Sequence, residues 1–289
     1  MILVTGSTGT IGQAVVRELV ARCAKVRALS RDAGRAMSLF GATADCATAS
    51  YDDAASLEAA MKDIERVFVL CPIHPDLAFF ESKVVAAARS AEVRHIVKLS
   101  TAGVEWVGQG PPEPTLWACH RQSEEHIEQS GVPYTHLRPD ACMQNILMFA
   151  HPIATGVYPA PTGDGRRAWV DVRDVAAAAA VVLTEEGHEG RSYELTGPED
   201  LSDDDIAAKL TTATGREVKH ANPPLEAARQ NMVDSGMPAG VASMIAEVMV
   251  AIAAGRSGKV TSGVSDVTGQ APRSFDAFAA ESRSAFIDA

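Results

Sequence analysis

The sequence has little of what marks secreted, metal-binding or nucleic-acid-binding proteins. Its 289 residues include five scattered cysteines, with no Cys-x-x-Cys pair. An odd number of isolated cysteines argues against a disulfide framework or a zinc site, and no histidines are spaced as a metal site, so we expect no metal. The net charge is −11 and no helix carries a basic cluster, so we expect no nucleic-acid partner.

Long apolar runs are also missing. The longest of them, such as residues 176–183, are much shorter than the roughly 20 residues that cross a bilayer. No signal peptide precedes the first apolar segment. We therefore expect a cytoplasmic protein without a membrane partner, acting as a monomer or a homodimer.

The N-terminal segment carries the strongest positive signal. Residues 2–4 are apolar and run into Gly6-x-x-Gly9-x-x-Gly12, after which a helix begins. Gly6 allows a tight turn, Gly9 lets the backbone approach a pyrophosphate, and Gly12 lets the helix pack close to the sheet. No Gly-Lys-Ser/Thr follows, which excludes a Walker-type loop. We predict a dinucleotide cradle at the helix N-terminus, formed by Gly6, Thr8, Gly9, Thr10, Ile11 and Gly12.

Strands and helices alternate along the first half of the chain. Alternation with short connections predicts an α/β fold, a Rossmann-type doubly wound parallel sheet that binds ligands at the carboxyl ends of its strands. Two later segments, 169–172 and 192–195, are expected to return strands to this sheet. The predicted strands are 25–30, 66–71, 94–100 and 134–138, and the predicted helices 56–61, 75–90 and 115–129.

The end of the second predicted strand indicates which dinucleotide binds. An acidic residue there would hold the 2′-hydroxyl of NAD, whereas Ser30 and Arg31 suit the 2′-phosphate of NADP. Asp32 is the counter-evidence, because it reaches a ribose if the strand ends later. A solvated surface position for Arg31 is the alternative. We predict NADP(H) in preference to NAD(H).

The domain boundaries follow from a change in composition near residue 150. We predict an NADP(H)-binding Rossmann domain over residues 1–150, to which 168–196 returns. A smaller, mostly helical C-terminal substrate lobe is predicted over 151–167 and 197–289, with a short strand near 217–220.

Several segments together resemble the NmrA-like branch of the short-chain dehydrogenase/reductase superfamily. They are the glycine motif with Thr5 before it and residues 95–101, 130–139, 170–176, 195–198 and 267–273. The resemblance covers most of the chain and implies an atypical Rossmann protein that binds NADP(H). Such a family includes NADPH-dependent quinone and dye reductases, and redox-sensing regulators that have lost catalysis.

The chain departs from the family pattern at three places. Ser50 and Tyr51 stand where relatives commonly have an aspartate for the adenine end, and Lys83 stands for a frequent asparagine. After residues 138–139, small residues replace bulky aromatics, which suggests a wider pocket. The predicted substrate residues are Trp106, Trp117, Ala141, Cys142 and Met143.

The catalytic pair of ordinary short-chain dehydrogenases is absent. In that Tyr-x-x-x-Lys pair the lysine lowers the tyrosine pKa, so that the phenol can exchange a proton with a carbonyl. The four tyrosines, at positions 51, 134, 158 and 193, have no lysine four residues later. A dehydratase or epimerase with bound NAD is therefore the least favoured function.

His120, on the helix where that pair usually lies, is the candidate substitute. A histidine gives or takes a proton near pH 7, and we expect Glu124, one turn later, to orient or charge it. Alternatively, His120 hydrogen-bonds the nicotinamide ribose or packs beneath it. Both readings stay open, with His120 a candidate catalytic and cofactor-binding residue.

Two strand ends supply the remaining candidates. Ser100 and Thr101 face the expected nicotinamide, where a hydroxyl can hold the carboxamide or a substrate oxygen, so Ser100 is also a catalytic candidate. Cys71 and Pro72 are expected to bracket the nucleotide, with the thiol as a packing residue because no neighbouring cation activates it.

The missing pair leaves two functions open. The first is an NADPH-dependent reductase that passes hydride to a planar, electron-poor small molecule, such as a quinone, an enone or an aromatic dye. Such aromatic or conjugated substrates need little acid catalysis. The second is a non-catalytic NADP(H)-sensing regulator that binds a protein partner through an apolar patch within residues 237–254.

Overall fold

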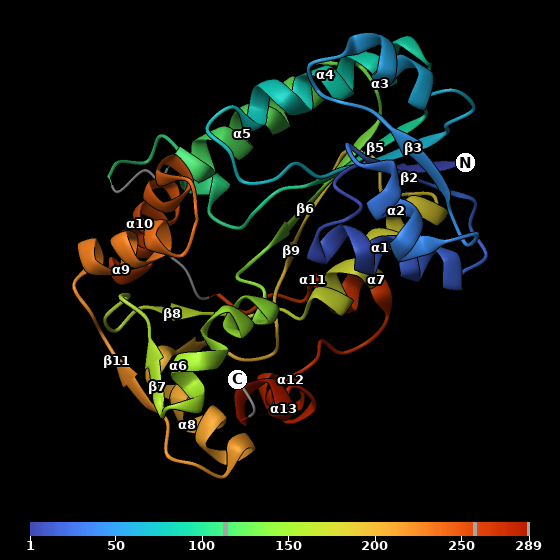
Figure 1. Cartoon of the computed structure of the whole chain (residues 1–289). Coiled ribbons are helices and arrows are strands. Elements are labelled where there is room, and N and C mark those ends of the chain that lie inside the picture. The colour runs from blue at the N-terminus through green and yellow to red at the C-terminus, as the bar shows by residue number, and fades with distance from the viewer. Residues whose placement is uncertain (112–114, 257–258, 288–289) are drawn as a thin grey trace. The chain divides into compact units, whose positions relative to one another are not determined.

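A computed structural model describes residues 1–111, 115–256 and 259–287 (Figure 1). The contacts within it divide the chain into two compact units, each with a hydrophobic cluster of its own. Unit 1 comprises Met1–Thr101, Cys119–Arg138 and Val172–Tyr193, and unit 2 comprises Ala102–Ala118, Pro139–Asp171 and Glu194–Ala289.

Unit 1 is built on a seven-stranded sheet in the order β3-β2-β1-β4-β5-β6-β9. Pairing is parallel between β3 and β2, β2 and β1, β1 and β4, β4 and β5, and β5 and β6. Strand order runs outward from β1 in both directions, which confirms the doubly wound fold and puts the switch point between β1 and β4. The strands are β1 (Ile2–Val4), β2 (Val26–Ser30), β3 (Asp45–Thr48), β4 (Arg66–Val69), β5 (His95–Leu99), β6 (Tyr134–Pro139) and β9 (Arg191–Leu195).

Helices cover both faces of this sheet. In Figure 1, α3, α4 and α5 lie on one face, and α1 and α7 pack against each other on the opposite face. The inner side of α1 consists of Gly12, Val15, Val16 and Leu19, a spacing of three or four residues that turns one apolar stripe toward the strands. The helices are α1 (Thr10–Ala21), α2 (Ala33–Phe40), α3 (Ala54–Ala60), α4 (Leu77–Ser90), α5 (Thr115–Glu128) and α7 (Val172–Thr184).

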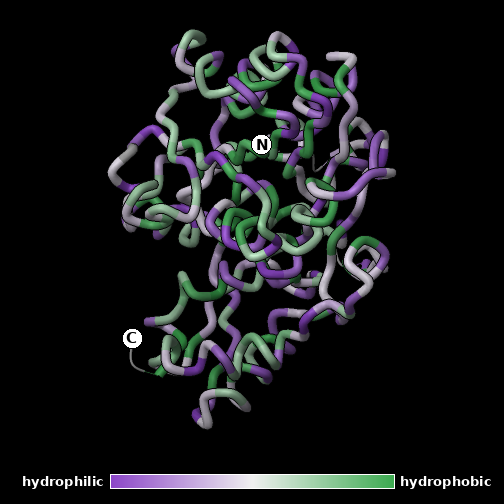
Figure 2. Tube along the Cα trace, turned by 90° about the vertical axis from the view of Figure 1, so that its right-hand side faces the viewer, coloured by the Kyte–Doolittle hydropathy of each residue, from purple (hydrophilic) through white to green (hydrophobic). Residues whose placement is uncertain are grey.

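The core of unit 1 is formed by the strands of the sheet together with the helices that cover them. Because helices cover both faces, whole strands are buried, and β5 has no exposed residue. Leu3, Val67 and Ile96 are fully buried, and each such side chain contributes about 1.5–3 kcal/mol by leaving water. Figure 2 shows hydrophobic and hydrophilic stretches alternating along the trace.

Unit 2 combines short strands with small helices. The strand β10 (Leu201–Ser202) pairs antiparallel with β8 (Arg166–Arg167), and β11 (Lys219–Ala221) pairs parallel with β7 (Val157–Pro159). The helical segments are η1 (Val104–Trp106), η2 (Met143–Phe149), α6 (Ala150–Ala154), α8 (Asp203–Thr214), α9 (Leu225–Asp234), α10 (Ala239–Ala253), α11 (Gly263–Thr268), α12 (Phe275–Glu281) and α13 (Arg283–Ile287).

A buried ion pair lies in the core of unit 2. Asp203 accepts hydrogen bonds from Tyr158 (3.2 Å), from Thr162, and from Arg167 (3.0 Å). The Arg167 guanidinium also stacks over the Trp169 ring, 4.2 Å from its centroid. Each group therefore has partners within the same cluster.

One predicted strand is wrong, and two elements of unit 1 were not predicted. Residues 169–172 form only an isolated bridge between Val170 and Cys142, and α7 begins at Val172. Their alternating apolar side chains look like a strand, but only Val170 finds a backbone partner across the bridge. The missed elements are α2 and β3.

Among the described helices, none is long and apolar enough to cross a membrane.

Candidate functional site

The glycine motif forms a loop that leaves no room for side chains at two of its positions. Gly6 has a φ of +58°, and a Cβ there would lie 2.7 Å from the carbonyl oxygen of Leu70. A Cβ on Gly12 would lie 2.1 Å from the carbonyl oxygen of Gly6. A Cβ on Gly9 would meet the same oxygen at an ordinary 3.4 Å. Internal packing therefore does not require a glycine at position 9, which agrees with the prediction that a ligand approaches the backbone there.

The first turn of α1 is open to an anion. Its N-cap is Gly9, which offers no side chain to the free backbone N–H groups, and no acidic residue occupies the first turn. Thr10 is exposed and Ile11 is half-buried, so the N–H groups of this turn lie at the surface. Free N–H groups and the positive end of the helix dipole make this terminus suitable for a pyrophosphate.

Two buried hydroxyls hold the loop against the neighbouring strands. Thr5 Oγ1 accepts from the N–H of Leu70 at 2.8 Å and donates to its carbonyl oxygen at 2.9 Å. Ser7 Oγ donates to the carbonyl oxygen of Leu29 at 2.8 Å. The loop is thereby fixed to the ends of both β4 and β2. The role of Ser7 is not evident from the sequence beyond its place inside the motif.

At the end of β2, the acidic candidate for nucleotide recognition, Asp32, and the basic candidate, Arg31, have different environments. Asp32 is the N-cap of α2, where its Oδ1 accepts from the N–H of Arg35 at 3.1 Å. Ser30 Oγ accepts from the N–H of Asp32 at 3.1 Å. Arg31 is exposed, and among the described residues no carboxylate pairs with it. The Asp32 carboxylate is thus occupied by the helix, whereas the guanidinium is available.

Arg31 lines a shallow pocket of about 230 Å³ next to the sheet. It is the only cation in that lining, and a phosphate fits it better than an uncharged ribose does. The other lining residues are Thr48, Ala49, Ser50, Asp53 and Ser56. Asp53 is at the same time the N-cap of α3, accepting from the N–H of Ser56.

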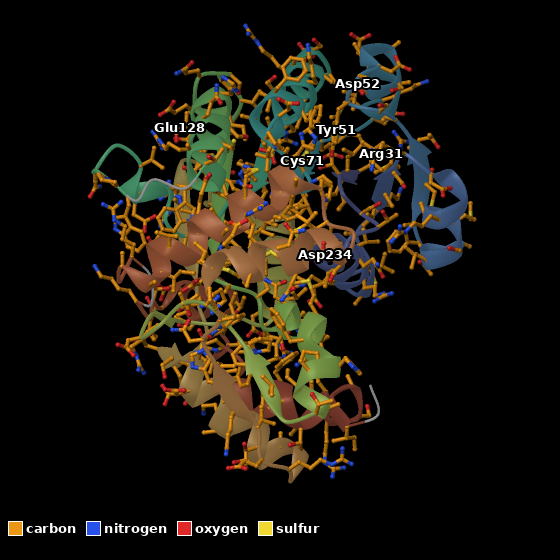
Figure 3. All side chains as sticks on the ribbon, turned by 60° about the vertical axis from the view of Figure 1, so that its left-hand side comes forward. Arg31, Tyr51, Asp52, Cys71, Glu128 and Asp234 are labelled. Carbon is orange, nitrogen blue, oxygen red and sulfur yellow. The ribbon has the colours of Figure 1, made fainter. Side chains whose placement is uncertain are left out.

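Cys71 and Tyr51 lie near Arg31, as the labels in Figure 3 show. The Tyr51 ring stacks on Phe80 with centroids 5.5 Å apart, and its hydroxyl donates to the carbonyl oxygen of Leu70 at 3.4 Å. Burial, with the nearby Glu81 carboxylate, raises the pKa of the Cys71 thiol to about 12. This thiol stays protonated, so it cannot act as a nucleophile at neutral pH. The next residue, Pro72, is exposed.

A buried lysine lies below the end of β5. Lys98 is fully buried, and its Nζ lies 2.5 Å from Glu81 Oε2, 3.1 Å from the carbonyl oxygen of Leu99 and 3.2 Å from His120 Nδ1. Ser123 donates to the same Glu81 oxygen. We did not predict this cluster. The available signal was a lysine inside an apolar strand and a glutamate on the apolar side of α4.

His120 is a buried neutral ring in this structure. It is 8% exposed, and burial together with the Lys98 ammonium holds its pKa well below the ordinary value. The expectation that Glu124 orients it is wrong, because Glu124 binds Arg138 through both carboxylate oxygens, at 2.9 and 2.7 Å. Arg138 carries a permanent charge and comes from the neighbouring strand β6, so it takes the carboxylate in preference to a neutral ring.

Ser100 lies on the same side of β5 as Lys98. Its hydroxyl is buried and close to the Glu124 carboxylate. Burial would raise the pKa of Glu124, but the hydrogen bonds and the positive charge of Arg138 hold it below its usual range. Thr101, which follows, is half-buried. Their predicted contacts with a nicotinamide remain predictions.

One group of side chains that includes Glu124 has the spacing of metal ligands, but its charges are already compensated. Ligand atoms of Glu124, Glu128 and His136 lie within 4.8 Å of one another. Arg138 already binds Glu124, and Arg121 lies 3.4 Å from Glu124 and 3.6 Å from Glu128. Two guanidinium groups therefore compensate the carboxylates, and we assign no metal to this cluster.

The predicted substrate residues lie in unit 2. The rings of Trp106 and Trp117 are tilted, with centroids 5.5 Å apart. Trp117 is 4% exposed and lies so close to Gly103 that a Cβ there would be 2.3 Å from the ring, whereas Trp106 is half-buried. Trp106 therefore presents more of its surface than Trp117 does.

The three predicted substrate residues after β6 differ in exposure. Ala141 is half-buried, Cys142 is 8% exposed, and Met143 is 1% exposed within the hydrophobic cluster of unit 2. Burial raises the pKa of Cys142 to about 12, with Asp140 and Asp171 adding to it. Ala141 is the residue of the three with surface to offer, and the substrate role of all three stays a prediction.

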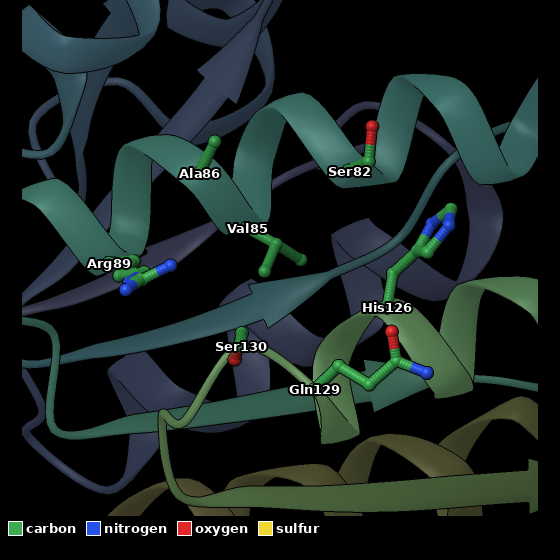
Figure 4. A pocket seen from close by; sticks show the side chains of 7 residues that line it. All are labelled: Ser82, Val85, Ala86, Arg89, His126, Gln129 and Ser130. Atoms are coloured by element: carbon green, nitrogen blue, oxygen red, sulfur yellow. The ribbon is translucent and has the colours of Figure 1, made fainter.

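Two further surfaces lie outside the predicted site. Figure 4 shows a groove of about 250 Å³ that contains none of the predicted site residues. The apolar side chains of α10 are mostly covered, and within the described part of that helix Val250 alone is a large exposed hydrophobic residue, at 40%. The groove is lined by Ser82, Val85, Ala86, Arg89, His126, Gln129 and Ser130.

Known proteins resemble this chain over nearly its whole length. The NAD(P)H azoreductase of Xenophilus azovorans is 36% identical over 288 residues, which are 99% of each chain. Quinone oxidoreductase 2 of Escherichia coli is 31% identical over 252 residues, 86% of each chain. The NADPH complex of that E. coli quinone oxidoreductase superposes with a TM-score of 0.86 at 28% identity, covering 97% of this chain and 99% of the other.

Two further solved structures share the fold of this chain. The Citrobacter triphenylmethane reductase complexed with NADP(H) has a TM-score of 0.84 at 27% identity, covering 98% of this chain and 99% of the other. The negative transcriptional regulator NmrA, in complex with NAD, shares the fold at 18% identity. The sequence profile of the NmrA-like family matches residues 1–278. With its doubly wound sheet, its glycine loop and this match, the chain belongs to the NmrA-like family.

Proposed function

We propose that this protein is an NADPH-dependent oxidoreductase that reduces planar, electron-poor small molecules, with quinones and azo or other aromatic dyes as the main substrate class. The observation that carries the proposal is the uncapped, glycine-bounded N-terminus of α1 together with Arg31, which follows β2 and has no carboxylate partner among the described residues. Full-length relatives that are named as reductases for azo compounds and quinones support it.

The chain's own residues divide the work of holding the cofactor. Backbone N–H groups of the first turn of α1 would bind the pyrophosphate, and Arg31 with Ser30 would bind the 2′-phosphate. Thr5 and Ser7 keep the loop in place between β4 and β2, so binding needs little rearrangement. When bound, NADPH supplies the hydride.

Hydride transfer to such substrates needs little acid catalysis from the protein. An electron-poor conjugated acceptor delocalises the charge that develops on hydride transfer, so alignment of donor and acceptor is the main protein contribution. This agrees with the absence of a Tyr-x-x-x-Lys pair. His120 and Ser100 are the polar groups that would lie next to the reacting atoms.

The test is NADPH oxidation by the purified protein with a benzoquinone, an azo dye, an enone and a simple ketone. We expect turnover with the first two, less with the enone and none with the ketone, whose reduction needs a proton donor at its oxygen. A Gly12→Val variant serves as the binding-deficient control. Tight NADPH binding with no turnover of any acceptor would contradict the proposal and favour a redox-sensing regulator.

A further inference from the structure

The Lys98 ammonium has a complete set of acceptors. An ammonium group has three N–H donors, and Lys98 Nζ has three partners: Glu81 Oε2, the carbonyl oxygen of Leu99, and His120 Nδ1. The side chain is fully buried, so water cannot replace any of these partners. Because the lysine has only donors to offer, the His120 Nδ1 atom must be the acceptor in this contact.

This assignment fixes the hydrogen on the other ring nitrogen. A neutral imidazole carries one N–H, and with Nδ1 accepting, the hydrogen is on Nε2. Among the described residues, Nε2 has no hydrogen-bond partner. The ring therefore has one nitrogen held by the protein and one left to donate to a bound molecule.

We propose that Lys98, supported by Glu81 and Ser123, is a positioning residue that locks His120 as a neutral Nε2–H hydrogen-bond donor. The consequence for turnover rests on the proposed reductase function. His120 would donate a hydrogen bond to the cofactor or to a substrate oxygen and would keep its proton, because a neutral ring that gave it up would become an imidazolate. The proton that completes reduction would then come from water.

The titratable groups on the elements around His120 favour the neutral state of its ring. The ammonium of Lys98 on β5 opposes a second positive charge, and the Glu81 carboxylate on α4 is already paired with it. Cys71, after β4, and Tyr51, before α3, lie near Glu81, and both have pKa values raised by burial, so neither contributes a charge near pH 7.

The remaining charges near the ring form a pair of their own. On the same helix, Glu124 is tied to Arg138 of β6, so its negative charge is compensated. Ser123 is neutral and donates to Glu81. The charged groups around His120 are thus paired with one another, and burial together with the Lys98 ammonium keeps the ring neutral.

The direct test is a long-range proton–nitrogen NMR correlation of the histidine rings in the full chain, with His120 assigned from a His120→Gln spectrum. We expect His120 to show the Nε2–H tautomer and no titration between about pH 5.5 and 8.5, where a free histidine ionises. The Nδ1–H tautomer, or ionisation near pH 6.5, would overturn the proposal. This readout needs no substrate.

The matched variant is Lys98→Met with Glu81→Gln, which removes both charges together so that no unpaired carboxylate stays buried. We expect its His120 to lose the fixed tautomer and to titrate at a higher pH than in the wild type. His95, a buried ring bonded to Thr135, serves as the internal control and should be unchanged in the same spectra. An unchanged His120 in this variant would contradict the role of Lys98.

The kinetic test separates positioning from folding. We expect kcat for the best quinone to fall by at least ~10-fold in the double variant, with the KM for NADPH within about twofold. The wild-type kcat should be flat across the histidine range, and the variant should gain a pH dependence there. If no acceptor is ever reduced, the proposed function fails, but the NMR result still decides the tautomer.

Discussion

Each unit of the molecule buries an ion pair, and the two pairs differ in what they leave open. In unit 2, Asp203 and Arg167 are enclosed by groups whose hydrogen bonds stay within the cluster. In unit 1, Glu81 and Lys98 hold a histidine as a third member, and one nitrogen of that ring is left for another molecule. A buried ion pair thus supports a fold in one place and prepares a polar group for chemistry in the other.

Acid should distinguish the units most strongly. In unit 1, burial lowers the pKa of both His95 and His136 to about 4, so the native state keeps them neutral while the unfolded chain protonates them near pH 6.5. The unfolded state binds more protons between these values, and stability therefore falls as pH decreases through this interval. The loss is about 3 kcal/mol for each ring at the lower end.

Amide hydrogen exchange at neutral and mildly acidic pH measures this effect. Protection should fall first in β5 and β6, which carry the two rings, while α8, which carries Asp203, keeps its protection longer. Simultaneous loss in all three elements would show that acid does not discriminate between the units.

Breaking either ion pair should give the next largest effect. Lys98→Met and Arg167→Met each leave a buried carboxylate without its cation, which costs about 3–5 kcal/mol in the free energy of unfolding. Chemical denaturation measures both. The exposed Arg22, paired with Glu18, provides the control, since Arg22→Met should change stability by less than ~1 kcal/mol.

A small loss of stability in Lys98→Met would contradict this expectation. If Lys98→Met destabilised no more than the Arg22 control, the Lys98 ammonium would not be holding a buried charge in place. Of the two core variants, only Lys98→Met should alter the ring signals of His120.

Two glycines with equally close contacts should separate binding from folding. A Cβ at Gly12 would lie 2.1 Å from the Gly6 oxygen, and one at Gly197 would lie 2.0 Å from the Trp169 oxygen. Gly12→Ala should weaken NADPH binding by at least ~100-fold, about 3 kcal/mol, by displacing the loop. Gly197→Ala should lower the stability of unit 2 and leave the affinity of the folded protein unchanged.

Calorimetric titration with NADPH and thermal unfolding read the two effects independently. Gly34→Ala is the mild control, because its Cβ would meet only the Asp32 carboxylate, at 3.3 Å. Normal NADPH affinity in Gly12→Ala would refute the assignment of the loop as the cofactor cradle.

The smallest expected effect concerns nucleotide preference. Arg31→Ala should lower NADPH affinity by about 10-fold, roughly 1.4 kcal/mol, through loss of a charge-assisted contact, while NADH affinity stays the same. Fluorescence titration with both nucleotides measures the difference, and Arg35→Ala should have a weaker effect of the same sign. An equal fall for both nucleotides would mean that Arg31 contacts something other than the 2′-phosphate.

The sequence predicted the parts of unit 1 that depend on local patterns. Apolar runs separated by helical periodicity gave the sheet, and Gly6, Gly9 and Gly12 gave the loop, because turn geometry restricts residue choice over a few positions. The strand β3 was missed because its four residues, Asp45–Thr48, have no fully buried position. The helix α2 was missed although Asp32 is a clear N-cap.

Local sequence patterns do not predict contacts between residues that are far apart in the sequence. Glu81 and Lys98 are 17 positions apart and meet only because α4 and β5 pack together. Glu124 was assigned to His120 from helical spacing, yet Arg138 from another strand binds it. Spacing along one helix identifies neighbours, but the strongest partner of a charge is decided by elements that fold against it.

The cap at the start of α2 has a consequence for redesign. Removing the Arg31 side chain would not by itself produce an NAD-specific protein, because the carboxylate nearest in sequence, Asp32, already caps α2 by accepting from the N–H of Arg35. Freeing that carboxylate would mean losing a cap that contributes about 1 kcal/mol. Cofactor choice in this chain is therefore tied to where a helix begins, and an engineer would have to move that boundary as well as change the side chain.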